Sequence, residues 1–207
     1  MNSSTVTSCT AFAGKRLIAS GGLLQVALKA QESLDLDKFA QVLIFDDATS
    51  NLIEVDLRGT RDDLSRRIAA TENAAAQTIE PASADAELRK PGRPKLGVVA
   101  REVTLLPRHW EWLSSQPGGA SVAIRKLVEQ ARKTNMGTDR VRTAKEATYR
   151  FMSAMCGNEP GFEEANRALF AGNQERFEQV TEPWPPDLRY HAQKLAVLAF
   201  DPPSLAQ

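Results

Sequence analysis

The spacing of hydrophobic residues near the start of the chain changes from a strand pattern to a helical one. Residues 10–13 and 16–19 flank Gly14-Lys15, a pair typical of a two-residue β-hairpin turn. Further on, Leu24, Ala27 and Leu28 recur with the spacing of one helix face. The pattern therefore predicts two strands followed by a helix.

The next stretch repeats this order. The apolar run 41–45 and the alternating segment 52–57 predict a second hairpin. A helix is expected to open at Thr60, because carboxylates occupy its first turn, where the helix dipole favours them. Residues 6–70 are thus predicted to form a small ββαββα domain of the α+β class.

Four charged residues stand at the ends of these predicted strands, namely Asp46, Asp47, Asp56 and Arg58. Carboxylates and a guanidinium are residue types that an acid–base site uses. No nucleophile, base or metal partner stands near them in the sequence. We therefore interpret them as turn-forming and capping residues.

Residues 71–95 are predicted to form a linker, because they are rich in Ala, Glu, Pro and Ser and lack sustained periodicity. The end of this linker, Lys90 to Lys95, resembles an AT-hook, an extended tract that lies in the minor groove of A·T-rich DNA. Prolines hold such a backbone extended, Gly92 permits close approach, and Arg93 is drawn to the negative potential of a narrow groove. Pro91 replaces the arginine that usually precedes the glycine, so a plain flexible basic arm is the alternative.

Residues 96–134 combine a short predicted strand with two predicted helices. The β-rich run 101–106 precedes Pro107, a residue suited to the first position of a helix. After a glycine turn, Ser121 is expected to be the N-cap of the second helix. That helix has an apolar stripe formed by Ile124, Leu127, Val128 and Ala131.

This order of elements resembles the ribbon-helix-helix DNA-binding module, and residues 119–131 match best. In that family two chains pair their strands into an antiparallel ribbon that enters the major groove. The N-terminus of the second helix holds a backbone phosphate. The resemblance implies a homodimer that binds DNA.

The predicted strand departs from what base recognition requires. Its two faces carry Arg101, Val103 and Leu105 on one side and Glu102, Thr104 and Leu106 on the other. Neither set suits the reading of base edges. Either basic contacts dominate affinity, or the segment keeps this fold for dimerisation alone; an ordinary amphipathic helix pair packed within the chain is a further alternative.

Charge is distributed unevenly although the whole chain has a net charge of zero. Residues 1–88 carry 8 basic and 13 acidic side chains, residues 89–150 carry 14 and 5, and residues 151–207 carry 4 and 8. A basic block between acidic ends is typical of a surface that binds a polyanion. The candidate DNA-binding residues are Lys90, Arg93, Lys95, Arg101, Thr104, Ser121, Arg125 and Lys126.

Residues 138–200 are predicted to be helical, with helices over 143–156, 162–171, 174–180 and from Asp187 onward. Asp187 and His191 share one face of the last helix. We interpret them as a helix cap and a surface ion pair, and Trp184 as a core residue.

Composition narrows the class of protein further. Hydrophobic residues make up 42% and charged residues 25% of the chain, as in a globular protein. Two cysteines and two histidines are too few for a disulfide scaffold or a dedicated zinc site. No apolar run approaches the ~18 residues of a membrane span, and the N-terminus has no secretory pattern, so we expect a cytoplasmic protein.

The chain has no catalytic motif, so we expect neither an enzyme nor a bound cofactor.

Most of the chain resembles a bacterial family of uncharacterised proteins, known as a domain of unknown function. The residues that carry the resemblance are 45–47, 56–60, 92–110, 162–165 and 167–170, with Trp184, Pro185, Asp187 and Arg189. This resemblance implies no activity. From the basic block and the strand–helix–helix order, we expect a DNA-binding transcriptional regulator. The alternative is a scaffold protein that self-associates through residues 96–134 without nucleic acid.

Overall fold

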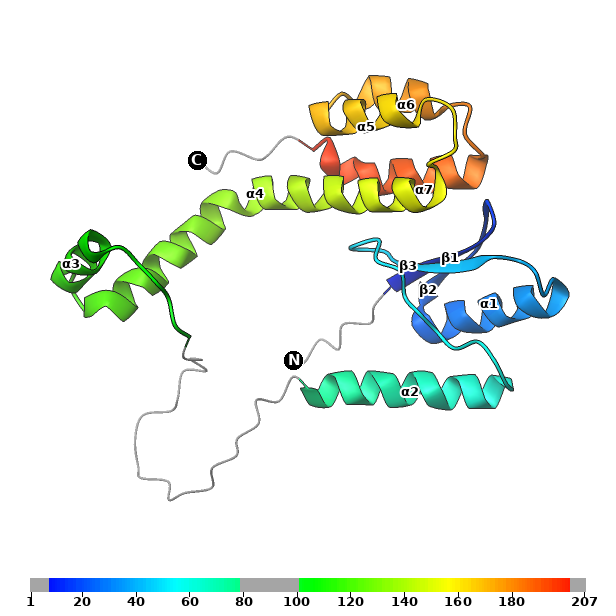
Figure 1. The fold of residues 1–207 in the computed structure, drawn as a ribbon, viewed down its shortest axis with the longest axis horizontal. Coiled ribbons are helices and arrows are strands. Elements are labelled where there is room, and N and C mark those ends of the chain that lie inside the picture. Colours follow the sequence, from blue (N-terminus) through cyan, green and yellow to red (C-terminus); the bar gives the residue numbers. More distant parts are fainter. Residues whose placement is uncertain (1–7, 79–100, 202–207) are drawn as a thin grey trace, which may run out of the picture. The chain divides into compact units, whose positions relative to one another are not determined.

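A computed structural model describes residues 8–78 and 101–201, with side chains up to residue 70 in the first of these ranges. The chain divides into two units (Figure 1). The first unit comprises Met1–Ala75 and Gly137–Gln207, and the second unit comprises Ala76–Met136. We describe each unit by itself.

An antiparallel sheet of three strands begins the first unit. Strands β1 (Ser8–Ala13) and β2 (Arg16–Gly22) form the predicted hairpin, and β3 (Val42–Asp46) pairs with the other side of β1, in the order β2-β1-β3. Gly14 has a φ of 56° in the hairpin turn, a conformation that glycine adopts without steric cost. The sheet therefore has β2 and β3 at its edges.

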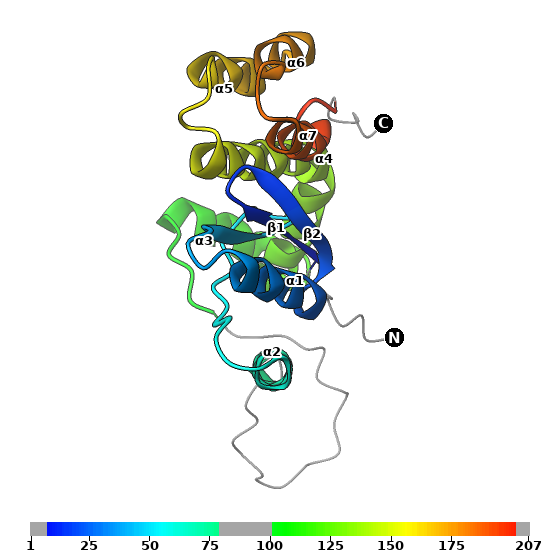
Figure 2. The same ribbon diagram turned by 90° about the vertical axis from the view of Figure 1, so that its right-hand side faces the viewer.

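Successive residues of β1 face opposite sides of the sheet, and each side packs against helices (Figures 1 and 2). Cys9 and Ala11 lie in a cluster with Val26 and Ala30 of α1 (Leu23–Leu36). Phe12 points the other way, into the larger cluster that the C-terminal helices form. One strand thus links the two layers of the core.

The helices after residue 137 form the larger core cluster. Helices α5 (Phe162–Ala171), α6 (Gln174–Thr181) and α7 (Pro186–Ala196) follow the end of α4 (Gly119–Met155), and a 3₁₀ turn covers Val197–Ala199. Trp184 is 2% exposed, and its Nε1 donates a hydrogen bond to the carbonyl oxygen of Pro160 over 2.8 Å. The predicted core role of Trp184 is confirmed.

The predicted fourth strand, residues 52–57, is not a strand. Leu52 forms an isolated bridge to Phe45, and the N–H of Ile53 donates to the carbonyl oxygen of Ile44 over 2.8 Å. The side chains that follow alternate between exposed and partly buried as predicted. The backbone leaves the sheet because side chains bind its carbonyl oxygens instead: Arg67 donates to Asp56, and Gln31 donates to Leu57. The first domain is therefore ββαβα rather than ββαββα.

Helix α2 (Arg61–Thr78) begins immediately after Thr60, as predicted. The Thr60 Oγ1 accepts a hydrogen bond from the N–H of Asp63, and the Asp63 carboxylate accepts one from the N–H of Thr60. This reciprocal arrangement is a capping box, which satisfies N–H groups that the helix itself leaves free.

The second unit contains α3 (Pro107–Ser115) and the first part of α4. The sequence indicated two separate helices on either side of residues 134–138, but α4 is continuous over them. Gly137 lies in the region of the expected break, and one interior glycine costs only about 1 kcal/mol relative to alanine. Without a proline to remove a backbone donor, that cost does not end the helix.

Candidate nucleic-acid interface

The helices α3 and α4 meet at a glycine turn. Pro107 stands at the start of α3, where its missing N–H costs nothing. Gly118 and Gly119 have φ values of 88° and 73°, in the left-handed region that favours glycine. The predicted pair of helices joined by a glycine turn is therefore present.

Ser121 does not cap α4, because that helix begins at Gly119 and Ser121 lies within its first turn. This prediction was wrong. With Ser121 as the N-cap the helix would begin at Val122, whereas it begins three residues earlier, at the glycine turn. The Ser121 carbonyl oxygen instead accepts a hydrogen bond from Arg125 Nε over 3.1 Å.

Arg101 and Thr104 lie in the segment 101–106, and both are exposed. Among the described residues, this segment belongs to no strand. The predicted ribbon would form between two chains, so it stays a prediction. Lys90, Arg93 and Lys95, with the AT-hook-like arm, lie outside the described residues.

Lys126 and Arg125 are adjacent exposed cations on α4. Within residues 101–136, neither forms an ion pair with a carboxylate, whereas Arg132 pairs with Glu129 over 2.8 Å. Two cations on one exposed helix without neutralising partners suit contact with phosphates.

The second unit buries little of its apolar surface. Among residues 101–136, the buried side chains are Leu113 and Ala123, at 4% and 6% exposure. Trp112 remains 51% exposed and Leu127 45%. A cavity of about 330 Å³ lies between the helices, lined by Leu105, His109, Trp112, Leu113, Ile124, Leu127 and Val128. A segment this short does not complete a core by itself.

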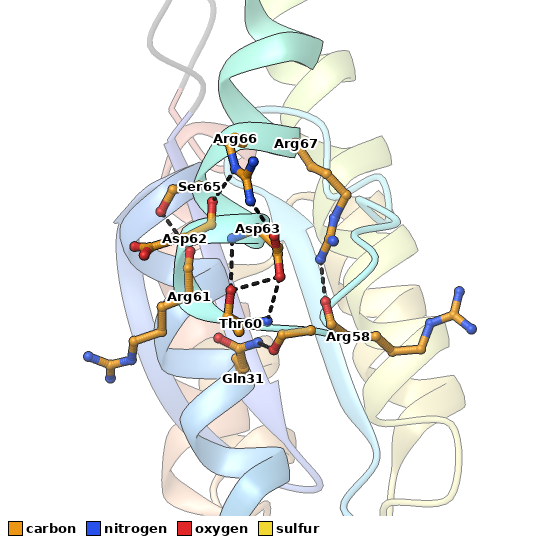
Figure 3. Close-up of polar contacts among 10 residues, drawn as sticks. Gln31, Arg58, Thr60, Arg61, Asp62, Asp63, Ser65, Arg66 and Arg67 are labelled. Atoms are coloured by element: carbon orange, nitrogen blue, oxygen red, sulfur yellow. Dashed lines mark hydrogen bonds and ion pairs between the residues drawn. The ribbon is translucent and has the colours of Figure 1, made fainter.

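A second candidate site, at the start of α2, holds four arginines (Figure 3). Each arginine has an acceptor within the chain: Arg58 binds Asp56, Arg61 binds Glu32, Arg66 binds Asp63, and Arg67 binds the carbonyl oxygens of Asp56 and Arg58. Hydrogen bonds from Arg58 hold the pKa of Asp56 below its usual value, and those from Thr60 do the same for the pKa of Asp63. This cluster fixes the loop before α2, as expected for capping residues.

Asp46 and Asp47, at the end of β3, also have structural roles. The Asp46 Oδ1 accepts hydrogen bonds from the N–H groups of Ala48 and Thr49, at 3.1 and 2.7 Å. The Asp47 carboxylate accepts from Ser8 and Thr10, both at 2.6 Å. The interpretation of these residues as turn-forming groups is consistent with these contacts.

The interpretation of Asp187 and His191 as a helix cap and a surface ion pair was wrong, because His191 is buried in the core and the N-cap of α7 is Pro185. His191 is 2% exposed, and its ring centroid lies 5.3 Å from that of Phe12 and 4.5 Å from that of Phe151. Burial lowers the pKa of His191 to about 4, so the imidazole is neutral at pH 7. Asp187 binds the backbone of β2 instead.

The described residues contain neither an activated cysteine nor a cluster of metal ligands. Burial raises the pKa of the Cys9 thiol to about 11 and that of Cys156 to about 12, which leaves both as thiols at neutral pH. No cluster of three metal-binding side chains occurs in residues 8–70 and 101–201. None of the helices in the described part of the chain has the length and hydrophobicity needed to span a membrane.

The described chain is a mixed α+β protein, with a small antiparallel sheet followed by a mostly helical remainder. It belongs to an uncharacterised protein family conserved in bacteria (DUF2239), whose model matches residues 8–196. Comparison with curated proteins and with solved structures gave no match.

The feature that the sequence analysis missed is the open cavity between α3 and α4. The stripe on α4 was recognised from its spacing, but Trp112 and His109 were not assigned to the same surface. The signal that points to it is the spacing of His109, Trp112 and Leu113 at i, i+3 and i+4, which places them on one face of α3. Whether such a stripe is covered depends on packing between helices, which spacing along one helix does not reveal.

Proposed function

We propose that this chain is a cytoplasmic DNA-binding protein that acts as a transcriptional regulator. In this proposal two copies associate through residues 96–134. The exposed cations of α4 contact phosphates, and the basic arm that contains Arg93 follows the minor groove. The observation that carries the proposal is the position of Arg125 and Lys126 beside an open apolar cavity on the same short unit, exposed and without a carboxylate partner among the residues that the structure describes.

The apolar cavity supports association of two copies. A helix pair that leaves Trp112 and Leu127 about half exposed gains stability when a second copy covers these side chains. The exposed segment 101–106 lies directly before α3 and belongs to no strand among the described residues, so a second copy is able to pair with it. Two-fold association would place two sets of cations on one assembly, which is how dimeric DNA-binding proteins span two half-sites.

The proposed contacts with DNA phosphates are tested through the salt dependence of DNA binding. Binding of the full chain to duplex DNA is measured by filter binding over a series of salt concentrations. Each lost phosphate contact is expected to reduce the slope of log K against log salt by about 1. Because the dimer carries two copies of each side chain, we expect Arg125→Gln and Lys126→Gln each to remove two contacts and to flatten the slope by about 2.

Lys194→Gln is the matched control, since it removes the same charge from an exposed site on α7. It is expected to leave the slope unchanged. A slope near zero for the unmodified chain would rule out the proposal. Equal effects of all three substitutions would show a diffuse charge effect rather than a site.

A second candidate function is a scaffold protein that self-associates without nucleic acid. The same cavity favours it, because exposed apolar side chains explain dimerisation without any role for the cations. This candidate predicts a dimer that has no affinity for DNA at low salt. It also predicts that Arg125→Gln changes neither association nor function.

A further inference from the structure

Two large apolar side chains project from the end of α1 in the first unit. Leu36 is 90% exposed and Phe39 is 98% exposed. The turn that presents them is well defined: the Asp37 carboxylate accepts a hydrogen bond from the N–H of Phe39 over 3.0 Å, and the N–H of Asp37 donates to the carbonyl oxygen of Ser33 over 3.0 Å. Phe39 is therefore held away from its own core by a hydrogen-bonded turn.

A shallow depression lies beside this turn, on the same face of the first unit. Its volume is about 320 Å³, and it is lined by Arg16, Leu17 and Ile18 of β2 and by Lys29, Glu32, Ser33 and Leu36 of α1. A cavity of roughly 150 Å³ accepts a benzene ring. The depression thus has room for a phenyl ring together with an aliphatic side chain.

The charges around the turn and the depression are complementary. Asp35 lies in the last turn of α1 and Asp37 at its C-cap, where the helix dipole already places negative charge, and no basic residue lies in that last turn. Lys38 offsets only part of this charge. In the depression, Glu32 is paired with Lys29 and Arg61, whereas Arg16 is exposed and forms no ion pair within the described residues. A cation from a second copy, placed at the end of α1, would offset the negative charge of Asp35, Asp37 and the helix dipole.

We propose that two copies of this chain associate through this face, with Phe39 of each copy seated in the depression of the other, against Arg16. The contact places the Arg16 guanidinium over an aromatic ring and close to Asp35 and Asp37 of the opposite copy. Both interactions favour the same position of the cation. Because projection and depression lie on one face, the contact is two-fold symmetric and closes after two copies.

The exposed area sets the strength of this association. An aromatic side chain buries about 150–250 Å². Two phenylalanine and two leucine side chains supply much of the buried area of a small interface. Without their flanking residues, that area falls short of the roughly 1,200 Å² that a stable complex buries. The contact is therefore weak and reversible. It is independent of the proposed DNA binding, since it uses residues of the first unit alone.

Crosslinking between two differently tagged versions of the full chain tests the proposal. One version carries Lys38→Cys on the projecting turn, and the other carries Ser33→Cys in the depression. The native Cys9 and Cys156 are buried, so a bismaleimide reacts at the introduced thiols. We expect a mixed product whose initial rate of formation falls at least tenfold when Phe39→Ala, or Arg16→Ala in the opposite version, is added.

Val197→Ala is the matched control, because Val197 is 63% exposed and lies outside the depression. It is expected to leave the rate unchanged. The absence of mixed product at every protein concentration up to the solubility limit would overturn the proposal. A rate that Phe39→Ala leaves unchanged would do so as well. Phe39 is too exposed for its removal to prevent folding, and DNA binding serves as a separate readout, so failure here leaves the proposed function untouched.

Discussion

The carboxylate of Asp187 accepts a hydrogen bond from the backbone N–H of Leu17 over 2.9 Å. Leu17 lies in β2, an edge strand of the sheet, whereas Asp187 lies in the first turn of α7. An edge strand presents unpaired N–H groups that invite pairing with other chains. Asp187 therefore joins the C-terminal helices to the sheet, and its carboxylate accepts a hydrogen bond from an N–H group at the edge of the sheet.

Removal of this acceptor is expected to destabilise the first unit. Asp187→Ala leaves the Leu17 N–H without its partner and should lower the free energy of unfolding by about 1–2 kcal/mol. Asp187→Asn retains an oxygen acceptor but loses the charge, so it should have a smaller effect. Urea denaturation measures both variants. Equal losses for the two would contradict a role for the hydrogen bond itself.

The sequence predicted the elements that short-range signals define. The Gly14-Lys15 turn, the start of α2 after Thr60 and the core position of Trp184 follow from neighbouring residues, and the structure has each of them. The Asp187–Leu17 contact joins residues 170 positions apart, and no local pattern indicates it. The continuity of α4 was missed because its apolar stripe ends at Ala131 and the residues that follow are mostly polar, so spacing alone does not show that the helix continues.

His191 is expected to make stability depend on pH. Its pKa is lowered from 6.5 to about 4 by burial, so between these values the unfolded chain binds a proton that the folded chain does not. Stability should therefore be unaffected by His191 above pH 6.5 and should fall as the pH drops toward 4, by up to about 3 kcal/mol. His191→Leu should lose this component of the slope. Denaturation at several pH values compares the two chains, and identical slopes would contradict the assignment.

The capping box at the start of α2 gives a third prediction (Figure 3). Thr60→Ala removes the oxygen that accepts from the Asp63 N–H, and it should cost about 1 kcal/mol. Ser65→Ala is the control, because Ser65 Oγ donates to the Arg61 carbonyl oxygen within the helix, and alanine favours helices more than serine. Amide hydrogen exchange in α2 measures the effect. Faster exchange in the Ser65 variant than in the Thr60 variant would refute it.

Gly161 precedes α5 with a φ of 76°, and a Cβ built on it would lie 2.7 Å from Cγ1 of Val180. Gly161→Ala combines a left-handed backbone with a steric clash, so it should lower stability by about 1–3 kcal/mol. Gly157→Ala is the matched control, since its Cβ would meet its nearest atom at 3.5 Å without a positive φ. Thermal unfolding should separate the two variants clearly. A Gly161 variant as stable as the Gly157 variant would show that Val180 moves aside.

The cavity between α3 and α4 gives the last prediction, which depends on the proposed dimer. Trp112→Ser together with Leu127→Ser removes apolar side chains that are already about half exposed within one chain. Folding of the first unit should be unaffected, whereas association through residues 96–134 should be lost. Sedimentation at low protein concentration, where the weaker Phe39 contact does not form, should then show a monomer.

Met136→Ser is the control for this experiment, because Met136 lies on α4 at 68% exposure and does not line the cavity. It should sediment like the unmodified chain, as a dimer. The proposed dimer would bury an apolar surface that the double variant no longer offers, so a dimer that persists in the double variant would place the interface elsewhere. In that case residues 96–134 would not form the dimer interface. The proposed arrangement of two sets of Arg125 and Lys126 on DNA would then lose its basis.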